Sequence, residues 1–224
     1  MSDTPAAAGE IEVLVCDFGG VLTSPLLGSF AAFQDSSGVP LESLGRAMAA
    51  AAERDSAHPL FELEKGHLSE RDFLAKLETG LEAELGRPVA MHAFAESYFA
   101  HLETNHELLD FVRDLRARGL RSAILTNNVR EWEPRWRAMI PVDELFEAVI
   151  DSAFVGMRKP EREIYALTLE RLGVAPEAAL LLDDIEINCA AAREAGMRAV
   201  WFQSNEQAKN EIEQILSGGA FTIG

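Results

Sequence analysis

Three carboxylates in this sequence each follow an apolar run, a placement that suits catalysis or metal binding. Asp17 comes directly after the run 11–16, and Asp183 and Asp184 come directly after the run 178–182. Short apolar runs of this kind predict β-strands, and the carboxyl ends of parallel strands meet at one edge of a sheet, where ligands bind. Because gathered like charges repel, the three side chains favour a divalent cation, and their hard oxygens suit Mg²⁺. In the alternative, Asp17 is only a turn residue and one of the acidic pair serves a helix N-terminus.

A second polar group points to an anionic ligand. Thr126 and Asn127 close the apolar run 121–125, and their hydroxyl, amide and backbone N–H groups suit phosphate oxygens. Lys159 precedes Pro160, which predicts the start of a helix, and its ammonium would be a compact positive charge for a phosphate. Ordinary turn chemistry and a surface lysine are the alternatives.

Three more residues belong to these segments. Gly19 and Gly20 follow Asp17 and predict a sharp turn or a close approach of the backbone. Asn188 follows the acidic pair, where its amide would brace the loop, unless it is an ordinary polar residue of a helix.

The elements that must position these residues alternate in type. Alternating strands and helices predict an α/β core with a parallel sheet, helices on both faces and right-handed crossovers. The predicted strands are 11–16, 121–125, 147–150, 178–182 and 199–202. The predicted helices of the core are 108–118, 161–172, 187–195 and 205–216.

Residues 25–105 differ in character, because amphipathic and alanine-rich stretches dominate and strand signals are few. Helices are predicted at 41–54, 69–85 and 91–102, and Ser69 is expected to cap the second of them. The domain organisation is therefore expected to be an α/β core at 1–24 and 106–224 with an all-helical insert at 25–105.

Composition limits the partners of the 224-residue chain. With 37 acidic and 20 basic residues, its net charge of −17 repels nucleic acid and anionic membranes. No apolar run is long enough to span a bilayer, and residues 1–10 are expected to be a flexible leader without the features of a secretion signal. Cys16 and Cys189 are expected to be reduced, buried thiols, which indicates a cytoplasmic protein. The sequence is compatible with both a monomer and a homodimer.

Four of these segments, in chain order, resemble the four motifs of the haloacid dehalogenase superfamily, and the match spans nearly the whole chain. Residues 123–127 and 155–160 are also similar to the N-terminal phosphatase domain of soluble epoxide hydrolases, and bacterial glucose-1-phosphatases are similar too. The helical insert resembles the cap domain of that superfamily. The segments are Asp17-Phe18-Gly19-Gly20-Val21-Leu22, Leu125-Thr126-Asn127, Arg158-Lys159-Pro160, and Leu182-Asp183-Asp184 with Asn188.

The resemblance implies a magnesium-dependent phosphatase acting on a small phosphorylated metabolite. Asp17 would be the nucleophile and form an aspartyl phosphate. The implied metal ligands are Asp17, Asp184 and the carbonyl of Gly19, with Asp183 supporting. The implied phosphate-binding residues are Thr126, Asn127, Lys159, Gly19 and Gly20, and Thr126 and Lys159 would also assist catalysis.

One departure from the superfamily concerns the general acid. Most of its phosphatases carry a second aspartate two residues after the nucleophile, and this chain has Gly19 there. Losing a general acid typically costs ~10²–10⁴ in rate. The similar glucose-1-phosphatases also have glycine, so the hypothesis is a substrate whose leaving group needs little protonation, such as an anomeric sugar oxygen, an acyl group or a phenolate.

Two other functions compete with this interpretation. A metal-independent 2-haloacid dehalogenase would use Asp17 on carbon, but it would not need the acidic pair Asp183-Asp184. A non-catalytic protein that binds a phosphorylated metabolite would explain the missing acid, but not the intact nucleophile.

Two further candidate groups lie outside the motifs. The first is a polar loop around a predicted helix break in the insert, with His58, Glu62, Glu64 and His67. It would either face the site and select the substrate or form a solvated hairpin. Trp132 and Trp136 would form one helical face above the site, or would pack in the core or against the insert.

Overall fold

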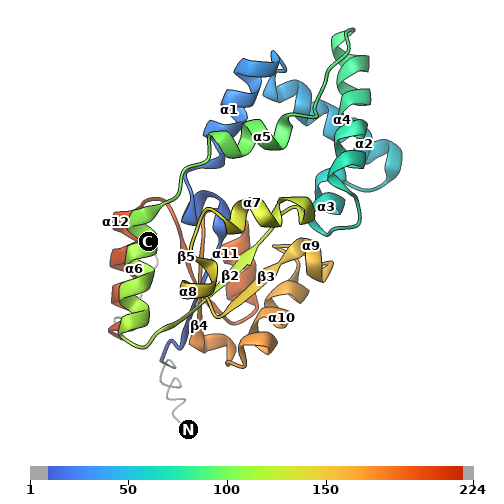
Figure 1. The fold of residues 1–224 in the computed structure, drawn as a ribbon. Coiled ribbons are helices and arrows are strands. Elements are labelled where there is room, and N and C mark those ends of the chain that lie inside the picture. Colours follow the sequence, from blue (N-terminus) through green and yellow to red (C-terminus); the bar gives the residue numbers. More distant parts are fainter. Residues whose placement is uncertain (1–9, 219–224) are drawn as a thin grey trace.

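The computed structural model describes residues 10–218 and contains one five-stranded parallel sheet (Figure 1). The strand order is β3-β2-β1-β4-β5, so β1 lies at the centre. The strands are β1 (Val13–Cys16), β2 (Arg121–Thr126), β3 (Ala148–Asp151), β4 (Ala179–Asp183) and β5 (Arg198–Trp201).

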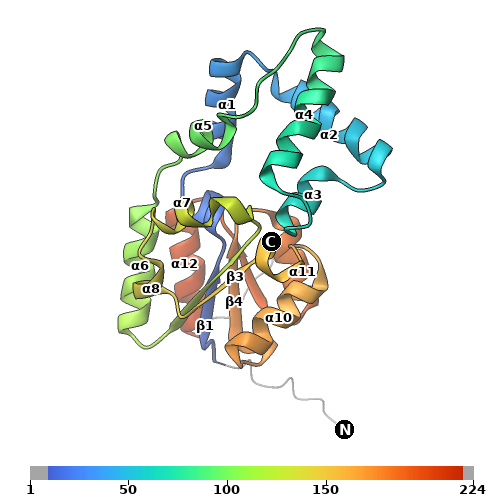
Figure 2. The ribbon, with the colours of Figure 1, turned by 45° about the vertical axis from the view of Figure 1, so that its right-hand side comes forward.

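Alternating side chains of the central strand build two separate cores. Leu14 and Cys16 face the core formed with α6 (His106–Ala117) and α12 (Asn205–Leu216). Val13 and Val15 face the core formed with α10 (Arg162–Leu172) and α11 (Glu186–Glu194). Because both faces are buried, all four side chains of β1 are fully covered, which explains its uninterrupted apolar sequence. Figures 1 and 2 show the two helix pairs on opposite sides of the sheet.

A helical insert, residues 26–100, lies beyond the carboxyl ends of the strands (Figures 1 and 2). The chain leaves and re-enters the core side by side, since Thr23 forms a β-bridge with Thr104 and Ser24 N donates to Glu103 O at 2.7 Å. The insert helices are α1 (Leu26–Ser37), α2 (Leu41–Asp55), α3 (Pro59–Glu64), α4 (Glu70–Leu85) and α5 (Phe94–Ala100).

The predicted fold class is confirmed, with shifts of one to three residues at most element ends. The Ser69 hydroxyl caps α4 by accepting from Asp72 N, as predicted. Of the predicted helix 91–102 only Phe94–Ala100 forms. Before it, Met91 N donates to the Glu78 side chain at 2.7 Å and residues 92–93 form a turn, and after it the chain turns at His101.

Several helices escaped prediction. They include α1 and α3 of the insert and two helices of four residues in the core, α8 (Val142–Leu145) and α9 (Ser152–Val155). The helical face considered for Trp132 and Trp136 corresponds to α7 (Glu133–Arg137) and the turn before it. One helical turn contains no complete hydrophobic period, so the sequence carries little signal for it.

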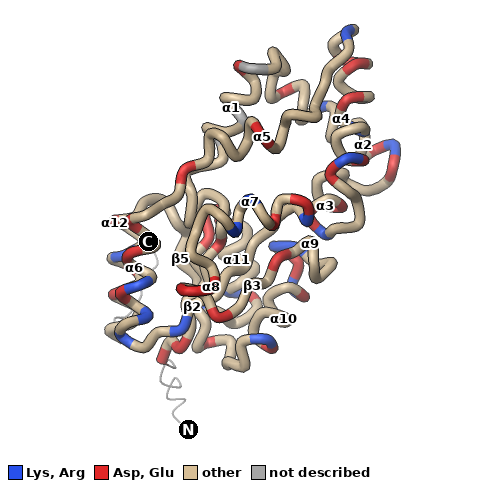
Figure 3. The backbone as a smooth tube through the Cα atoms, in the orientation of Figure 1, with Lys and Arg blue, Asp and Glu red and all other residues tan. Residues whose placement is uncertain are grey.

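Three further features bear on partners and location. Acidic residues spread over both insert and core (Figure 3), and no described helix is long and apolar enough to cross a membrane. Cys16 and Cys189 are buried free thiols whose pKa values burial raises to about 12. The leader predicted at 1–10 lies, apart from Glu10, outside the described residues.

Candidate active site

Asp17 stands where the central strand ends. Its backbone N–H continues the sheet by donating to Leu182 O at 2.9 Å. Its Oδ1 accepts from Phe18 N at 2.7 Å and lies 2.9 Å from Lys159 Nζ. Within the described part of the chain, Oδ2 accepts no hydrogen bond, so one oxygen of this nearly buried carboxylate is left for chemistry. Burial raises the pKa of Asp17 to about 7, although the ammonium of Lys159 acts in the opposite direction.

Lys159 is fully buried between two carboxylates, so it is not the surface lysine of the alternative interpretation. Its Nζ lies 2.9 Å from Asp17 Oδ1 and 2.5 Å from Asp183 Oδ2. Burial alone would lower the pKa of Lys159, but the two carboxylates raise it above its usual value. The site therefore holds a permanent positive charge beside Asp17, inside a chain of net charge −17.

The backbone of Lys159 is held by Asn127. The Asn127 side chain accepts from Lys159 N at 2.8 Å and donates to Lys159 O at 2.9 Å. Asn127 directly follows β2, and Lys159 stands in the loop before α10, so this pair of bonds fixes the loop against the sheet edge. Sequence reasoning offered both the side-chain amide and the backbone N–H of Asn127 to phosphate, and it missed that the side chain is bound to the backbone of Lys159.

Asp183 is fully engaged as a support. Its Oδ1 accepts from Ile185 N and from Asn188 Nδ2, both at 2.9 Å, and its Oδ2 is bound to Lys159. Asn188 thus braces the loop, as predicted. With both oxygens occupied, Asp183 orients Lys159 and the loop that carries Asp184.

Asp184 has an unused oxygen. Its Oδ1 is buried with no hydrogen-bond partner, and burial followed by the charge of Asp183 raises its pKa. One carboxylate oxygen from each of Asp17, Asp183 and Asp184 lies within 4.8 Å of the others. A buried, unpaired carboxylate oxygen in such a cluster is costly unless a cation neutralises it, so the residues present fit a bound Mg²⁺.

Glycine is required at one of the two positions after Phe18. Gly20 adopts φ +78°, and a Cβ there would lie 2.2 Å from Asp184 Oδ2. Gly19 has an ordinary φ of −70°, and a Cβ there would meet only the side chain of Leu26 at 3.2 Å. The close approach predicted from the glycine pair is thus found at Gly20 and Asp184.

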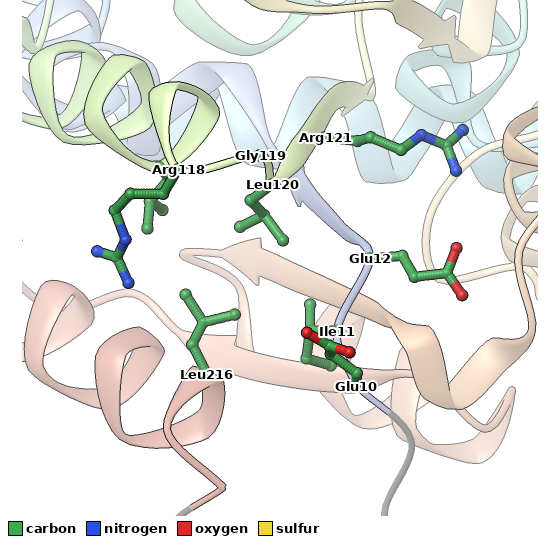
Figure 4. A pocket seen from close by; sticks show the side chains of 9 residues that line it. Glu10, Ile11, Glu12, Arg118, Gly119, Leu120, Arg121 and Leu216 are labelled. Atoms are coloured by element: carbon green, nitrogen blue, oxygen red, sulfur yellow. The ribbon is translucent and has the colours of Figure 1, made fainter.

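The remaining predicted residues adjoin a cavity between core and insert. Gly19, Thr126 and Asn127 line this cavity of about 260 Å³, and Thr126 is buried at the end of β2. A second cavity, of about 440 Å³, lies at the opposite edge of the sheet (Figure 4). Its arginines are already paired, Arg118 with Glu213 and Arg121 with Glu147, so the chain itself neutralises their charges.

Contacts between the insert and the core were the least predictable part of the site. Glu64 lines the 260 Å³ cavity and accepts from Arg158 Nε at 2.5 Å, so it belongs to no solvated hairpin. The guanidinium of Arg158 also lies 4.0 Å from the ring centre of Phe61. Trp132 packs against the insert and lines the cavity, while Trp136 is buried against Phe18, in agreement with the packing alternative. No local pattern predicts a contact such as Glu64–Arg158 across 94 positions.

The sequence matches known proteins along most of its length. The model of a family described as haloacid dehalogenase-like hydrolase matches residues 11–196. Phosphatase MT3486 of Mycobacterium tuberculosis is 30% identical over 155 residues, which cover 68% of this chain and 70% of that protein. Bifunctional epoxide hydrolase 2 of Mus musculus is 24% identical over 217 residues, which cover 92% of this chain. The chain spans only part of other curated relatives: 39% of that epoxide hydrolase and 12% of acyl-CoA dehydrogenase family member 10 of Mus musculus.

Solved structures share the fold. A HAD family enzyme of Bacteroides thetaiotaomicron, in complex with magnesium and inorganic phosphate, matches with a TM-score of 0.61 and 23% identity, over 87% of this chain and 96% of that chain. The L-2-haloacid dehalogenase of Xanthobacter autotrophicus, with chloropropionic acid covalently bound, matches with a TM-score of 0.60 and 20% identity, over 91% of this chain and 83% of that chain. At these identities the likeness concerns the fold alone.

Proposed function

Because the chain belongs to the haloacid dehalogenase-like hydrolases, we propose that it hydrolyses a small phosphomonoester with Mg²⁺ through an aspartyl phosphate on Asp17. The observation that carries the proposal is the buried ammonium of Lys159, 2.9 Å from Asp17, next to the unpaired Oδ1 of Asp184. This arrangement offers a nucleophile, a fixed positive charge and a vacant carboxylate ligand at one sheet edge.

In the first step, a carboxylate oxygen of Asp17 attacks phosphorus, and the bond from phosphorus to the organic oxygen breaks. Lys159 neutralises negative charge on the transferring group, and the Thr126 hydroxyl and Asn127 N–H help to hold it. Water then attacks the aspartyl phosphate, releases inorganic phosphate and restores Asp17. Gly19 gives no proton to the departing oxygen, so a stable leaving group is favoured.

Asp17, Asp184 and the carbonyl of Gly19 would hold the Mg²⁺ ion. When bound, the ion supplies charge neutralisation for the phosphoryl oxygens and for the carboxylate cluster. The carboxylate oxygens of Asp183 contact Lys159, Ile185 N and Asn188. Asp183 would therefore support the metal site without binding the ion directly. The helical insert is proposed to act as a cap, with the core at 1–24 and 106–224, in a cytoplasmic monomer or homodimer.

The acidic cluster favours phosphoryl transfer over the two competing functions. A metal-independent dehalogenase has no use for the unpaired oxygen of Asp184 beside Asp17 and Asp183. A non-catalytic binding protein has no use for the free Oδ2 of Asp17.

A panel of phosphomonoesters, assayed with Mg²⁺ and again with chelator, tests the proposal. Phosphate release should require Mg²⁺, and Asp17→Asn should lower kcat by at least about 10³-fold, because the nucleophile is lost while the side chain keeps its shape. Halide release from 2-haloacids without metal would favour the dehalogenase instead. Phosphate binding without turnover in the wild-type protein would favour the binding protein.

A further inference from the structure

The cavity between insert and core is lined almost entirely by apolar side chains. The insert contributes aliphatic and aromatic residues from all five of its helices, α1 to α5, among them Met48, Leu77 and Tyr98. The core contributes Phe18 and Trp132. A largely apolar cavity of about 260 Å³ favours apolar ligand groups, because these give up no hydrogen bonds to water when they enter it.

Polar groups at the cavity surface are few, and those of Glu64 and Asn127 are engaged within the protein. Among the described lining residues Glu64 alone carries a charge, and Arg158 binds it at 2.5 Å. The Asn127 side chain is bound to the backbone of Lys159 at both ends. A ligand bearing several hydroxyl groups would therefore leave many of them without partners, which costs affinity.

The cavity adjoins the proposed phosphate site. Gly19, Thr126 and Asn127 belong to both, because they line the cavity and stand at the same sheet edge as Asp17. Tyr98 lies close enough for the negative charges of Asp17 and Asp184 to contribute to raising its pKa, after the larger effect of burial. A phosphomonoester whose phosphorus faces Asp17 would thus extend its organic part into the cavity.

We propose that the substrate is a phosphomonoester with an apolar, ring-sized organic group, and that this group occupies the cavity. The inference rests on the proposed phosphatase function and narrows its substrate class. It disfavours sugar phosphates, which the resemblance to glucose-1-phosphatases left open.

Two substrates of matched shape test this inference. Cyclohexylmethyl phosphate and glucose 6-phosphate both carry a six-membered ring on a primary alkoxide, so their leaving groups are similar and their rings differ in polarity. The kcat/KM for cyclohexylmethyl phosphate should be at least about tenfold higher, since an apolar pocket favours the group without hydroxyls. An equal or reversed ratio would overturn the inference, as would a higher kcat/KM for octyl phosphate, which would indicate a chain-binding site.

A matched pair of variants locates the selectivity. Met48→Gln places an amide in the cavity wall and should lower that ratio at least about threefold. Leu85→Gln makes the equivalent change in α4, at a partly buried position outside the cavity lining, and should preserve the ratio. If Met48→Gln and Leu85→Gln gave the same ratio, the cavity would not be the binding site.

Acetyl phosphate separates this inference from the proposed function, because its acyl group is too small to use the cavity. Mg²⁺-dependent turnover of acetyl phosphate together with a preference for glucose 6-phosphate would sink the inference and leave the phosphatase intact. Absence of turnover with every phosphate ester and with acetyl phosphate would sink both.

Discussion

Gly19 and Gly20 follow the candidate nucleophile, but different constraints act on the two positions. Gly20 has a left-handed backbone, and a side chain there would collide with the Asp184 carboxylate. Gly19 has a backbone that any residue adopts, and the flexible Leu26 side chain is its neighbour. The acidic cluster therefore requires glycine at position 20, whereas position 19 can accept a side chain.

Gly20→Ala is expected to remove Mg²⁺ binding and activity. The added methyl would force Asp184 away and would occupy a φ region that costs an L-residue about 1–2 kcal/mol. Isothermal titration calorimetry with Mg²⁺ measures the effect. Gly28→Ala is the matched control, because the structure leaves open space there within α1; unchanged Mg²⁺ affinity in Gly20→Ala would refute the assignment of Asp184.

Gly19→Asp is expected to restore proton donation to poor leaving groups. The kcat for an alkyl phosphate should rise at least about tenfold relative to that for an aryl phosphate, because only the alkoxide needs the proton. Gly19→Asn has nearly the same shape but no acidic proton, and it should leave this relative rate unchanged. Equal effects of Asp and Asn would show that shape, and not acidity, is responsible.

At the scale of elements, strand ends assemble the site. The ends of β1, β2 and β4 were predictable because apolar runs stop abruptly at polar residues, and parallel pairing brings them together. The orientation of the Lys159 loop was not predictable, because it depends on the Asn127 side chain across 32 positions. Periodicity carries no information about such a contact.

Asn127→Ala is expected to loosen that loop. Two partly buried hydrogen bonds to the backbone of Lys159 would be lost, at about 1–3 kcal/mol in the free energy of unfolding. Urea denaturation measures the loss, and kcat/KM should fall with it. Asn127→Asp keeps the acceptor for Lys159 N but loses the donor to Lys159 O, so its stability should lie in between. An unfolding free energy unchanged in Asn127→Ala would contradict the role given to this side chain.

At the scale of the whole molecule, the insert is joined to the core beside Lys159. Glu64 of α3 binds Arg158, and both side chains are about 85% covered. Lys65 adds a second ion pair with Glu161 at 2.6 Å. The sequence indicated a helical insert from its composition, and it offered the loop around Glu64 as one that would face the site. It did not indicate Arg158 as the partner of Glu64, because that pairing depends on tertiary packing.

Glu64→Gln is expected to weaken this junction. Arg158 would keep a buried charge without its carboxylate, which should lower the free energy of unfolding by about 1–3 kcal/mol in urea denaturation. The control is Glu84→Gln, which removes the partner of the exposed Arg46 within the insert and should change stability little. Equal losses in the free energy of unfolding for Glu64→Gln and Glu84→Gln would mean that the buried Glu64–Arg158 pair stabilises the protein no more than an exposed ion pair does.

The most direct test of the account is a crystal structure of the protein with Mg²⁺ and beryllofluoride, which mimics a phosphoryl group on a carboxylate. We expect beryllium bonded to an oxygen of Asp17, a cation in contact with Asp17 and Asp184, and Lys159 Nζ within hydrogen-bond distance of a fluoride. A cation bound away from Asp184, with Asp17 unmodified at saturating beryllofluoride, would contradict the account.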